Sequence, residues 1–346
     1  MKMKICFAGS FKYYFYDEVC VQALEHLGCD VMRFAWQAYY GSGLLSTVQQ
    51  RFLLGYGIFK LNKDFIDCIK KNKPDVVYIN RGVPIWPITL KKIKRYTNST
   101  LVSNNNDDPF GQAKGMRLWS HFVRGIPLYD LNFVYRPCNI EEYFNYGARR
   151  VEVLMPYYVP QLHYPIQHNE NDRKNYACDI AFVGHGKKDD RLKHLECLAK
   201  AGYDFHLYGW HWDRLSRKLS WLRGHYSPPV WELDYTRTIS KARIALIFFT
   251  RANRDTYTRR SFEIPAIGTC MLSERTQDML ELFREDVEAV YFSSTEELLK
   301  KVDWLLNNEN ERLKIAEKAM DRIKKLKASV HDRMMQALTT IQELIP

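Results

Sequence analysis

The segment RRSFEIPAIGTCMLSE, residues 259–274, places Arg259, Arg260 and Glu263 directly before a short apolar run that contains a glycine. The glutamate follows the two arginines at helical spacing, so the three side chains share one face of a helix. Arginine forms bidentate hydrogen bonds with phosphate, and a glutamate can accept hydrogen bonds from a ribose diol. The pattern therefore suits a site for a leaving diphosphate, with the arginines as catalytic candidates. An intrahelical salt bridge is the alternative interpretation.

A second candidate is the glycine turn of FVGHGKKDDR, residues 182–191, between an expected strand and an expected helix. The backbone N–H groups of such a turn can approach a phosphate, and His185 could donate a hydrogen bond to a diphosphate. The segment lacks the GxGxxG spacing of a dinucleotide site, and a plain strand-to-helix turn is the alternative. The candidate residues for this ligand, called the donor below, are Gly184, His185, Gly186, Tyr208, Gly209, Glu263 and Ser273.

The first half of the chain ends an expected strand with NNNDDP, residues 104–109. Asp107 and Asp108 could supply a general base or hold sugar hydroxyls, so both are catalytic candidates. They equally suit a turn or a helix cap, because Asp satisfies local backbone groups and Pro109 suits a helix start. Other strand ends supply the candidates for binding a second substrate, the acceptor: Gly9, Ser10 and Arg81.

The sequence predicts no metal site and no cofactor. Its 8 cysteines are scattered without a CxxC pair, which is typical of small buried side chains in a reducing compartment. His206 and His211 are not spaced like the histidines of an HExxH motif. No unambiguous DxD-like pair ends a strand, so we expect an activity that needs no metal.

Apolar strands alternate with helical patterns in both halves, which predicts parallel α/β sheets. Helices are expected over residues 17–28, about 44–72, 189–202 and, as a pair, 294–328. The expected strands are residues 4–9, 29–36, 74–82, 100–109, 129–137, 149–158, 178–186, 203–210, the end of 239–249, 268–274 and 288–292.

The polar, proline-containing residues 159–176 are the expected linker. We therefore expect an N-terminal Rossmann-like domain over 1–165, a C-terminal one over 176–328, and a C-terminal helix over 329–346 that packs back on the N-terminal domain. Ligands of such sheets bind outside the carboxyl ends of the strands. In a tandem arrangement both sets of strand ends can face one central cleft.

The chain of 346 residues has a formal net charge of +11, which favours an anionic partner. No zinc-finger spacing or RNA-binding aromatic signature is present, so nucleic acid is not an expected partner. No apolar run is long enough to span a membrane, and the start does not resemble a signal peptide.

Residues 39–65 mix leucine, phenylalanine and tyrosine with Arg51, Lys60 and Lys63, and a basic cluster follows at 91–95. This composition predicts weak, salt-sensitive association with an anionic membrane. The alternative is an ordinary helix with its apolar face on the sheet. Gly55 and Gly57 argue against one continuous helix here.

The segments CDIAFVGHGKKDDR, DFHLYGWHW and RRSFEIPAIGTCMLSERTQDMLELFREDVEAVYFSSTEEL, with the lysine-rich terminal helix, resemble the CgeB-like glycosyltransferases. These are named for a spore-maturation protein and belong to the GT-B clan. KPDVVYINRG, NNNDDP and YDLNFVYRPCNIEEYFNYGARRVEVLMPYY extend the resemblance over nearly the whole chain. It is strongest over residues 178–330.

The resemblance implies the GT-B fold: two Rossmann-like domains facing a central cleft, the first binding the acceptor and the second the nucleotide sugar. Relatives with a Glu-x7-Glu motif place the second glutamate on the donor ribose, and Glu263 matches that position. Asp255 stands where the first glutamate is expected, which makes it a further catalytic candidate. This departure leaves open whether the anomeric configuration is retained or inverted.

The resemblance thus implies a metal-independent glycosyltransferase that moves a hexosyl or deoxyhexosyl group from a nucleotide sugar to a glycan or lipid-linked glycan. Such an enzyme would serve surface polysaccharide biosynthesis in the cytoplasm, at the inner face of the membrane where it associates with lipid. A nucleotide-sugar epimerase and a catalytically silent sugar- or nucleotide-binding protein of coat or capsule assembly are the alternatives.

Overall fold

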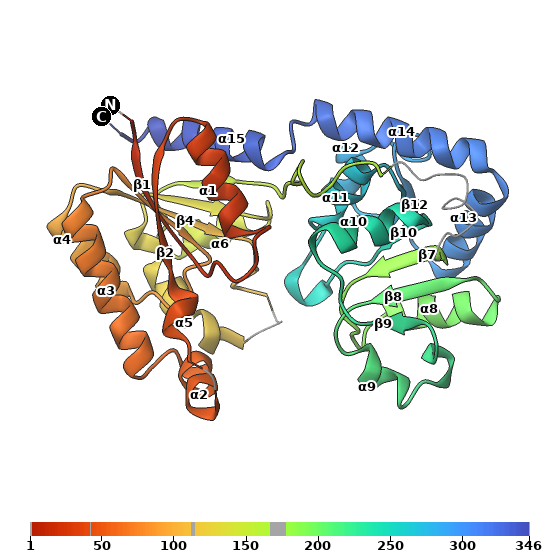
Figure 1. Cartoon of the computed structure of the whole chain (residues 1–346), viewed down its shortest axis with the longest axis horizontal. Helices are drawn as coiled ribbons and strands as arrows, with labels where there is room; N and C mark the ends of the chain where they lie inside the picture. Colours follow the sequence, from red (N-terminus) through yellow and green to blue (C-terminus); the bar gives the residue numbers. More distant parts are fainter. Residues whose placement is uncertain (1, 42, 112–114, 167–177, 346) are drawn as a thin grey trace. The chain divides into compact units, whose positions relative to one another are not determined.

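Figure 1 shows the computed structural model of the chain, which describes residues 2–41, 43–111, 115–166 and 178–345. The chain divides into two compact units. Unit 1 consists of Met1–Pro156, Arg251–Asp255 and Val330–Pro346, and unit 2 consists of Tyr157–Thr250 and Thr256–Ser329. A short segment from the second half of the chain and the C-terminal helix therefore belong to unit 1.

Unit 1 is built on a parallel sheet of six strands in the order β2-β1-β3-β4-β5-β6. Both faces carry helices, so the strands read as nearly continuous apolar runs rather than alternating ones. The stacked rings of Phe7 and Tyr78, 4.9 Å apart, belong to its core. The strands are β1 (Lys4–Gly9), β2 (Asp30–Ala35), β3 (Val76–Asn80), β4 (Thr100–Asn105), β5 (Leu131–Val134) and β6 (Val151–Val153).

The helices of unit 1 are α1 (Asp17–His26), α2 (Leu44–Phe52), α3 (Tyr56–Asn72), α4 (Pro87–Tyr96), α5 (Gly115–Gly125), α6 (Asn139–Asn145) and α15 (Val330–Gln342). Gly28, two residues beyond the end of α1, has a positive φ of +91°, which only glycine adopts without strain. Gly55, at φ +113°, separates α2 from α3. α15 packs along α1 (Figure 1).

Unit 2 repeats the plan with a parallel sheet in the order β12-β11-β10-β7-β8-β9. Its core includes Phe182, Trp212 and Phe248, whose rings meet edge to face. The strands are β7 (Cys178–Val183), β8 (Phe205–Tyr208), β9 (Tyr226–Ser227), β10 (Ala242–Ile247), β11 (Cys270–Glu274) and β12 (Val290–Phe292).

The helices of unit 2 are α8 (Arg191–Lys200), α9 (Trp212–Ser216), α10 (Glu232–Lys241), α11 (Arg260–Ile267), α12 (Gln277–Leu282), α13 (Thr295–Asn307) and α14 (Glu309–Lys325). Ser294 caps α13, because its side chain accepts a hydrogen bond from the Glu297 backbone N–H at 3.1 Å. α11 ends at Gly268, with φ +83°, and leads directly into β11.

Every strand expected from the sequence is present, and the two-residue strand β9 is an addition that its length concealed. The expected helical region 44–72 is two helices, as its glycines indicated. The expected linker lies partly outside the described residues, and its first part, 159–166, belongs to unit 2. Within the ranges that the structure describes, no helix has both the length and the apolar character needed to cross a bilayer.

Candidate active site

The loops after β7 and β8 are joined through their backbones. The Gly184 N–H donates to the Tyr208 carbonyl at 2.8 Å, and the Gly186 N–H donates to the Trp210 carbonyl at 2.9 Å. Gly209 has φ +156°, and a Cβ atom at this position would overlap the Gly184 carbonyl oxygen. The predicted donor-binding glycines thus form one rigid turn at the carboxyl edge of the unit 2 sheet.

Positive charge surrounds His185 in this turn. Burial lowers the pKa of His185, and the nearby charges of Arg260, His211, Lys187 and Arg191 lower it further. The His185 and His211 rings are 6.1 Å apart, and Arg191 donates to the His185 carbonyl at 3.0 Å. The imidazole is therefore neutral at pH 7 and is set among cations, an environment that suits an anionic ligand.

The two predicted catalytic arginines point to different partners. Arg260 Nη1 donates to the Val183 carbonyl at 3.0 Å, which fixes this guanidinium at the end of β7. Its Nε is buried and has no hydrogen-bond partner among the residues that the structure describes. A buried donor of this kind is costly unless a ligand accepts from it. Of the two arginines, Arg260 is the one held beside the glycine turn.

Arg259 instead pairs with Glu263, its Nε lying 2.9 Å from Glu263 Oε1. The salt bridge that the sequence left as an alternative is therefore present. Its guanidinium also lies 4.8 Å from the centre of the Tyr157 ring. The pair is largely buried, which distinguishes it from an ordinary surface salt bridge of small value.

His163 completes the surroundings of Glu263. Its Nδ1 accepts from the Val159 N–H at 2.9 Å, and its Nε2 lies 3.9 Å from Glu263 Oε1. Burial lowers the pKa of His163 to about 4, and Glu263 opposes that shift only in part. For Glu263, burial raises the pKa, but Arg259, His163 and Arg260 outweigh it, so the net pKa is lowered. Glu263 is therefore an anion held in a fixed orientation.

The remaining donor-binding candidates have backbone or internal contacts. Ser273 is fully buried and donates from Oγ to the Glu274 carbonyl at 3.1 Å. Tyr208 contributes its carbonyl to the turn, and its ring lies 4.8 Å from His206. The structure thus gives both residues positions at the site edge of the sheet without bringing their side chains to Glu263, and their donor-binding role stays a prediction.

In unit 1, the acceptor candidates Gly9 and Ser10 surround a buried carboxylate that the sequence did not single out. Asp17 accepts from the Phe11 N–H at 2.8 Å, from Asn80 Nδ2 at 2.7 Å and from the Ser10 hydroxyl at 3.2 Å. Burial raises its pKa, and these hydrogen bonds partly counter the rise. A Cβ atom at Gly9 would overlap the Asp17 carboxylate, so this glycine is required by packing.

The neighbouring aspartates after β4 have different environments. Asp107 forms an ion pair with the acceptor candidate Arg81, which stays 45% exposed. The Asp108 side chain is fully enclosed. It accepts hydrogen bonds from Arg254 Nε at 2.7 Å and from Arg254 Nη2 at 2.9 Å. It also accepts from the Phe110 N–H, which makes it the turn former that the sequence allowed as an alternative. Pro109 begins no helix, because residues 109–111 are bends.

Asp255, the catalytic candidate at the first-glutamate position, pairs with Arg136. Arg136 is almost completely buried and also donates to the Asn106 carbonyl at 3.2 Å. Asp255 and Arg254 thus anchor the segment 251–255 in unit 1. The ion pair with Arg136 is a structural reason for an acidic residue at position 255. The catalytic role of Asp255 stays a prediction.

Sequence reasoning missed Asp17, Arg136, Arg254 and His163. Asp17 begins a helix eight positions after Gly9, a spacing that could have signalled a carboxylate at the first strand end. The other three reach partners about 100 residues or more away in the chain, and no local pattern marks such contacts.

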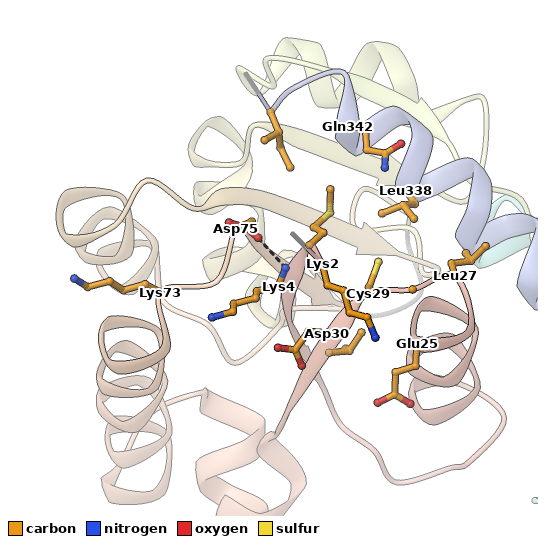
Figure 2. Close-up of a pocket in the computed structure, with 14 residues that line it drawn as sticks. Lys2, Lys4, Glu25, Leu27, Cys29, Asp30, Lys73, Asp75, Leu338 and Gln342 are labelled. Carbon is orange, nitrogen blue, oxygen red and sulfur yellow. Dashed lines mark hydrogen bonds between the residues drawn. The ribbon is translucent and has the colours of Figure 1, made fainter.

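An open pocket of about 1230 Å³ lies in unit 1, at the amino-terminal edge of its sheet, opposite the edge that carries Arg81 and Asp107. Figure 2 shows that Lys2, Lys4 and Lys73 share its rim with Glu25, Asp30 and Asp75. Because the lysines and acids balance and the Asp75 carboxylate already accepts from the Lys4 N–H at 2.7 Å, its charge selects no ligand. No group of three His, Cys, Asp or Glu side chains that could hold a metal occurs among the described residues.

The contact between Gly209 and Gly184 gives a sharp test of the turn. We expect Gly209→Ala to lower the free energy of unfolding by about 2–4 kcal/mol, because two backbones must separate. Gly202→Ala is the matched control: Gly202 also has positive φ, at +77°, but nothing lies within 4 Å of an added Cβ atom. Urea denaturation compares the two variants, and equal stabilities would show that the backbone contact is unimportant.

Comparison with known proteins gives one family match and several similar folds. Residues 191–339 match the family described as Glycosyl transferase-like, a match that falls mainly on unit 2. No curated protein matches the sequence. Several solved structures are similar over nearly the whole chain.

A glycosyltransferase from Rickettsia africae covers 99% of this chain and 98% of its own, with 13% identity and a TM-score of 0.70. Sucrose-phosphate synthase from Thermosynechococcus elongatus covers 99% of both chains, with 10% identity and a TM-score of 0.73. Anabaena HepE, in complex with UDP and glucose, covers 99% of this chain and 100% of its own, with 12% identity and a TM-score of 0.72. The chain thus has the GT-B fold of glycosyltransferases, which confirms the fold predicted from the sequence.

Proposed function

We propose that the chain is a glycosyltransferase that moves a hexosyl or deoxyhexosyl group from a nucleotide sugar to a glycan or glycoconjugate. The observation that carries the proposal is the cationic glycine turn around His185, with Arg260 fixed beside it and the Arg259–Glu263 pair on the same helix. This turn lies next to the residues that match the Glycosyl transferase-like family. UDP is the first nucleotide to test, because the HepE structure contains it.

The chemistry assigned to unit 2 is stabilisation of the leaving group. An acceptor hydroxyl oxygen bonds to the anomeric carbon, and the bond from that carbon to the diphosphate oxygen breaks. The bonding pair leaves with the nucleoside diphosphate, whose growing charge is met by Arg260, held beside the glycine turn. Glu263 accepts hydrogen bonds from the ribose hydroxyls, oriented by Arg259 and His163.

The acceptor proton requires a base, and we assign this role to Asp107. Its side chain keeps 17% of its surface exposed, whereas Asp108 is enclosed and Asp255 is paired with Arg136. Asp107 also forms an ion pair with Arg81, which holds its carboxylate in place. Gly9 and Ser10 lie on the same edge of the unit 1 sheet and contribute to the acceptor site.

The finer proposals rest on the sequence. The resemblance to CgeB-like enzymes supports surface polysaccharide biosynthesis in the cytoplasm, with a lipid-linked glycan as acceptor. Cationic side chains around His185 supply the positive charge that a metal supplies in other transferases. We therefore propose that the reaction needs no bound metal.

A panel of nucleoside diphosphates tests the proposal by thermal shift. The correct nucleotide binds only the folded chain, so at 100 times its Kd it should stabilise the protein by about 2.7 kcal/mol. Sugar transfer with the matching nucleotide sugar should then persist in excess EDTA. No stabilisation by any nucleotide would reject the proposal, whereas conversion of the donor without acceptor would indicate an epimerase, and binding without turnover a silent binding protein.

A further inference from the structure

Unit 1 exposes a group of large apolar side chains where α2 turns into α3. We call residues 48–59 the α2–α3 tip. The exposed fractions are 58% for Leu54, 77% for Tyr56 and 55% for Phe59, and Val48 and Phe52 are also exposed. Exposed single apolar residues are common, but five of them gather within the twelve residues of the tip.

The patch continues onto α4. Trp86 Nε1 donates to the Leu53 carbonyl at 3.2 Å, and the Trp86 ring lies 6.5 Å from the ring of Phe59. Ile88, in the first turn of α4, is 52% exposed. Trp86 therefore connects the tip with Ile88, which lies two residues further along the chain.

Core packing does not account for these residues. The face of α3 that covers the sheet is supplied by Ile58, Leu61, Phe65 and Ile69, all of them fully buried. Tyr56 and Phe59 lie outside this face and add nothing to the core. The interpretation of residues 39–65 as an ordinary core helix thus explains α3 but not the tip.

The charge around the tip is mainly basic. Between Asp30 and Asp64 the chain contains no acidic residue, and none occurs between Asp75 and Asp107. The exposed basic side chains are Arg51 on α2, Lys60 and Lys63 on α3, and Lys91 and Lys92 on α4, and on α3 the half-buried Asp64 and the exposed Asp67 follow the two lysines. Apolar side chains beside a mainly basic surface are complementary to an anionic lipid surface.

The topology places this surface near the proposed acceptor site. α2 follows β2, and α4 follows β3, so the tip and the start of α4 lie on the carboxyl side of the unit 1 sheet. Figure 1 shows α2 beyond the ends of the unit 1 strands. Arg81 and Asp107 follow β3 and β4 at that same edge. A lipid held by the tip would thus present its glycan toward these residues.

We propose that the α2–α3 tip, with Trp86 and Ile88, docks unit 1 on an anionic bilayer and so selects lipid-linked acceptors. This step rests on the proposed glycosyltransferase function. Tyrosine, tryptophan and phenylalanine enter the headgroup region, while the lysines stay in contact with anionic headgroups. The surface attaches the enzyme reversibly, because it offers only side chains to the bilayer.

Flotation with vesicles of phosphatidylcholine containing about one phosphatidylglycerol in five tests the docking. The full chain should float with these vesicles at low salt, and much less at high salt or with phosphatidylcholine alone. The triple variant Leu54→Ser, Tyr56→Ser, Phe59→Ser should reduce the bound fraction by about tenfold. These side chains are exposed, so the variant keeps its fold, which its thermal unfolding verifies.

Leu313→Ser is the matched control, because Leu313 is a similarly exposed leucine, 53%, on α14 of unit 2. It should float like the wild type, and Lys60→Glu with Lys63→Glu should lose binding without any apolar change. Flotation of the triple variant at the wild-type level, or no flotation of the wild type, would overturn the docking proposal. Nucleotide binding by unit 2 is measured on the same samples: if it persists, only the docking fails, and if it is absent, the transferase proposal itself fails.

Discussion

Replacing Glu263 with alanine is expected to weaken the binding of the nucleotide sugar by roughly 10- to 100-fold. A charged acceptor for the ribose hydroxyls is lost, and hydrogen bonds to charged groups contribute about 1.5–3 kcal/mol. The lowered pKa of Glu263 keeps this acceptor ionised at neutral pH. Isothermal titration calorimetry with the nucleotide identified by the panel measures the change.

The same substitution also affects folding, and the two effects must be separated. Glu263 is 10% exposed at its side chain, and its removal leaves Arg259 without this partner, at a cost of about 3 kcal/mol. Glu288 is a control in the same unit: its side chain is equally buried, and it pairs with Arg284, four positions before it, in a turn rather than in a helix. Both alanine variants should lose stability, but only Glu263→Ala should lose nucleotide affinity. Equal affinities in the two variants would remove Glu263 from the ribose site.

The elements of the fold could be predicted because their signals are local. An apolar run such as that of Val76–Asn80 predicts a strand whatever the rest of the chain does. The glycine turn 184–186 and the arginine pair before Ile264 also carry local patterns. Even so, the sequence did not show that Arg259 and Arg260 bind different partners. Helical spacing fixes the position of each Cα atom, but a long arginine side chain can extend in several directions from it.

Long-range polar contacts could not be predicted. The hydrogen bonds of Arg254 with Asp108 and of Arg136 with Asp255 each join residues more than 100 positions apart. An ion pair depends on which charges lie close together in the folded chain. Other arginines lie near Arg254 in the sequence, and the sequence alone does not show which of them pairs with Asp108. The pairing with Arg254 gives Asp108 a role as a buried anchor, and its catalytic role stays a prediction.

Asp108→Ala is therefore expected to destabilise unit 1 by about 3–5 kcal/mol, because Arg254 and Asn139 lose a buried acceptor. Glu142→Ala, at the exposed end of the same arginine, should cost about 1 kcal/mol or less. Burial raises the pKa of Asp108, but Arg254, Phe110 and Asn139 overcome it, so its folded pKa lies below the unfolded value. Its contribution is thus complete above the unfolded pKa and disappears as the pH falls through the folded one. Urea denaturation measures the free energies of unfolding of the wild type and of Asp108→Asn, and the two values should converge at acidic pH. If the variant keeps its stability but loses turnover, the catalytic role of Asp108 is favoured instead.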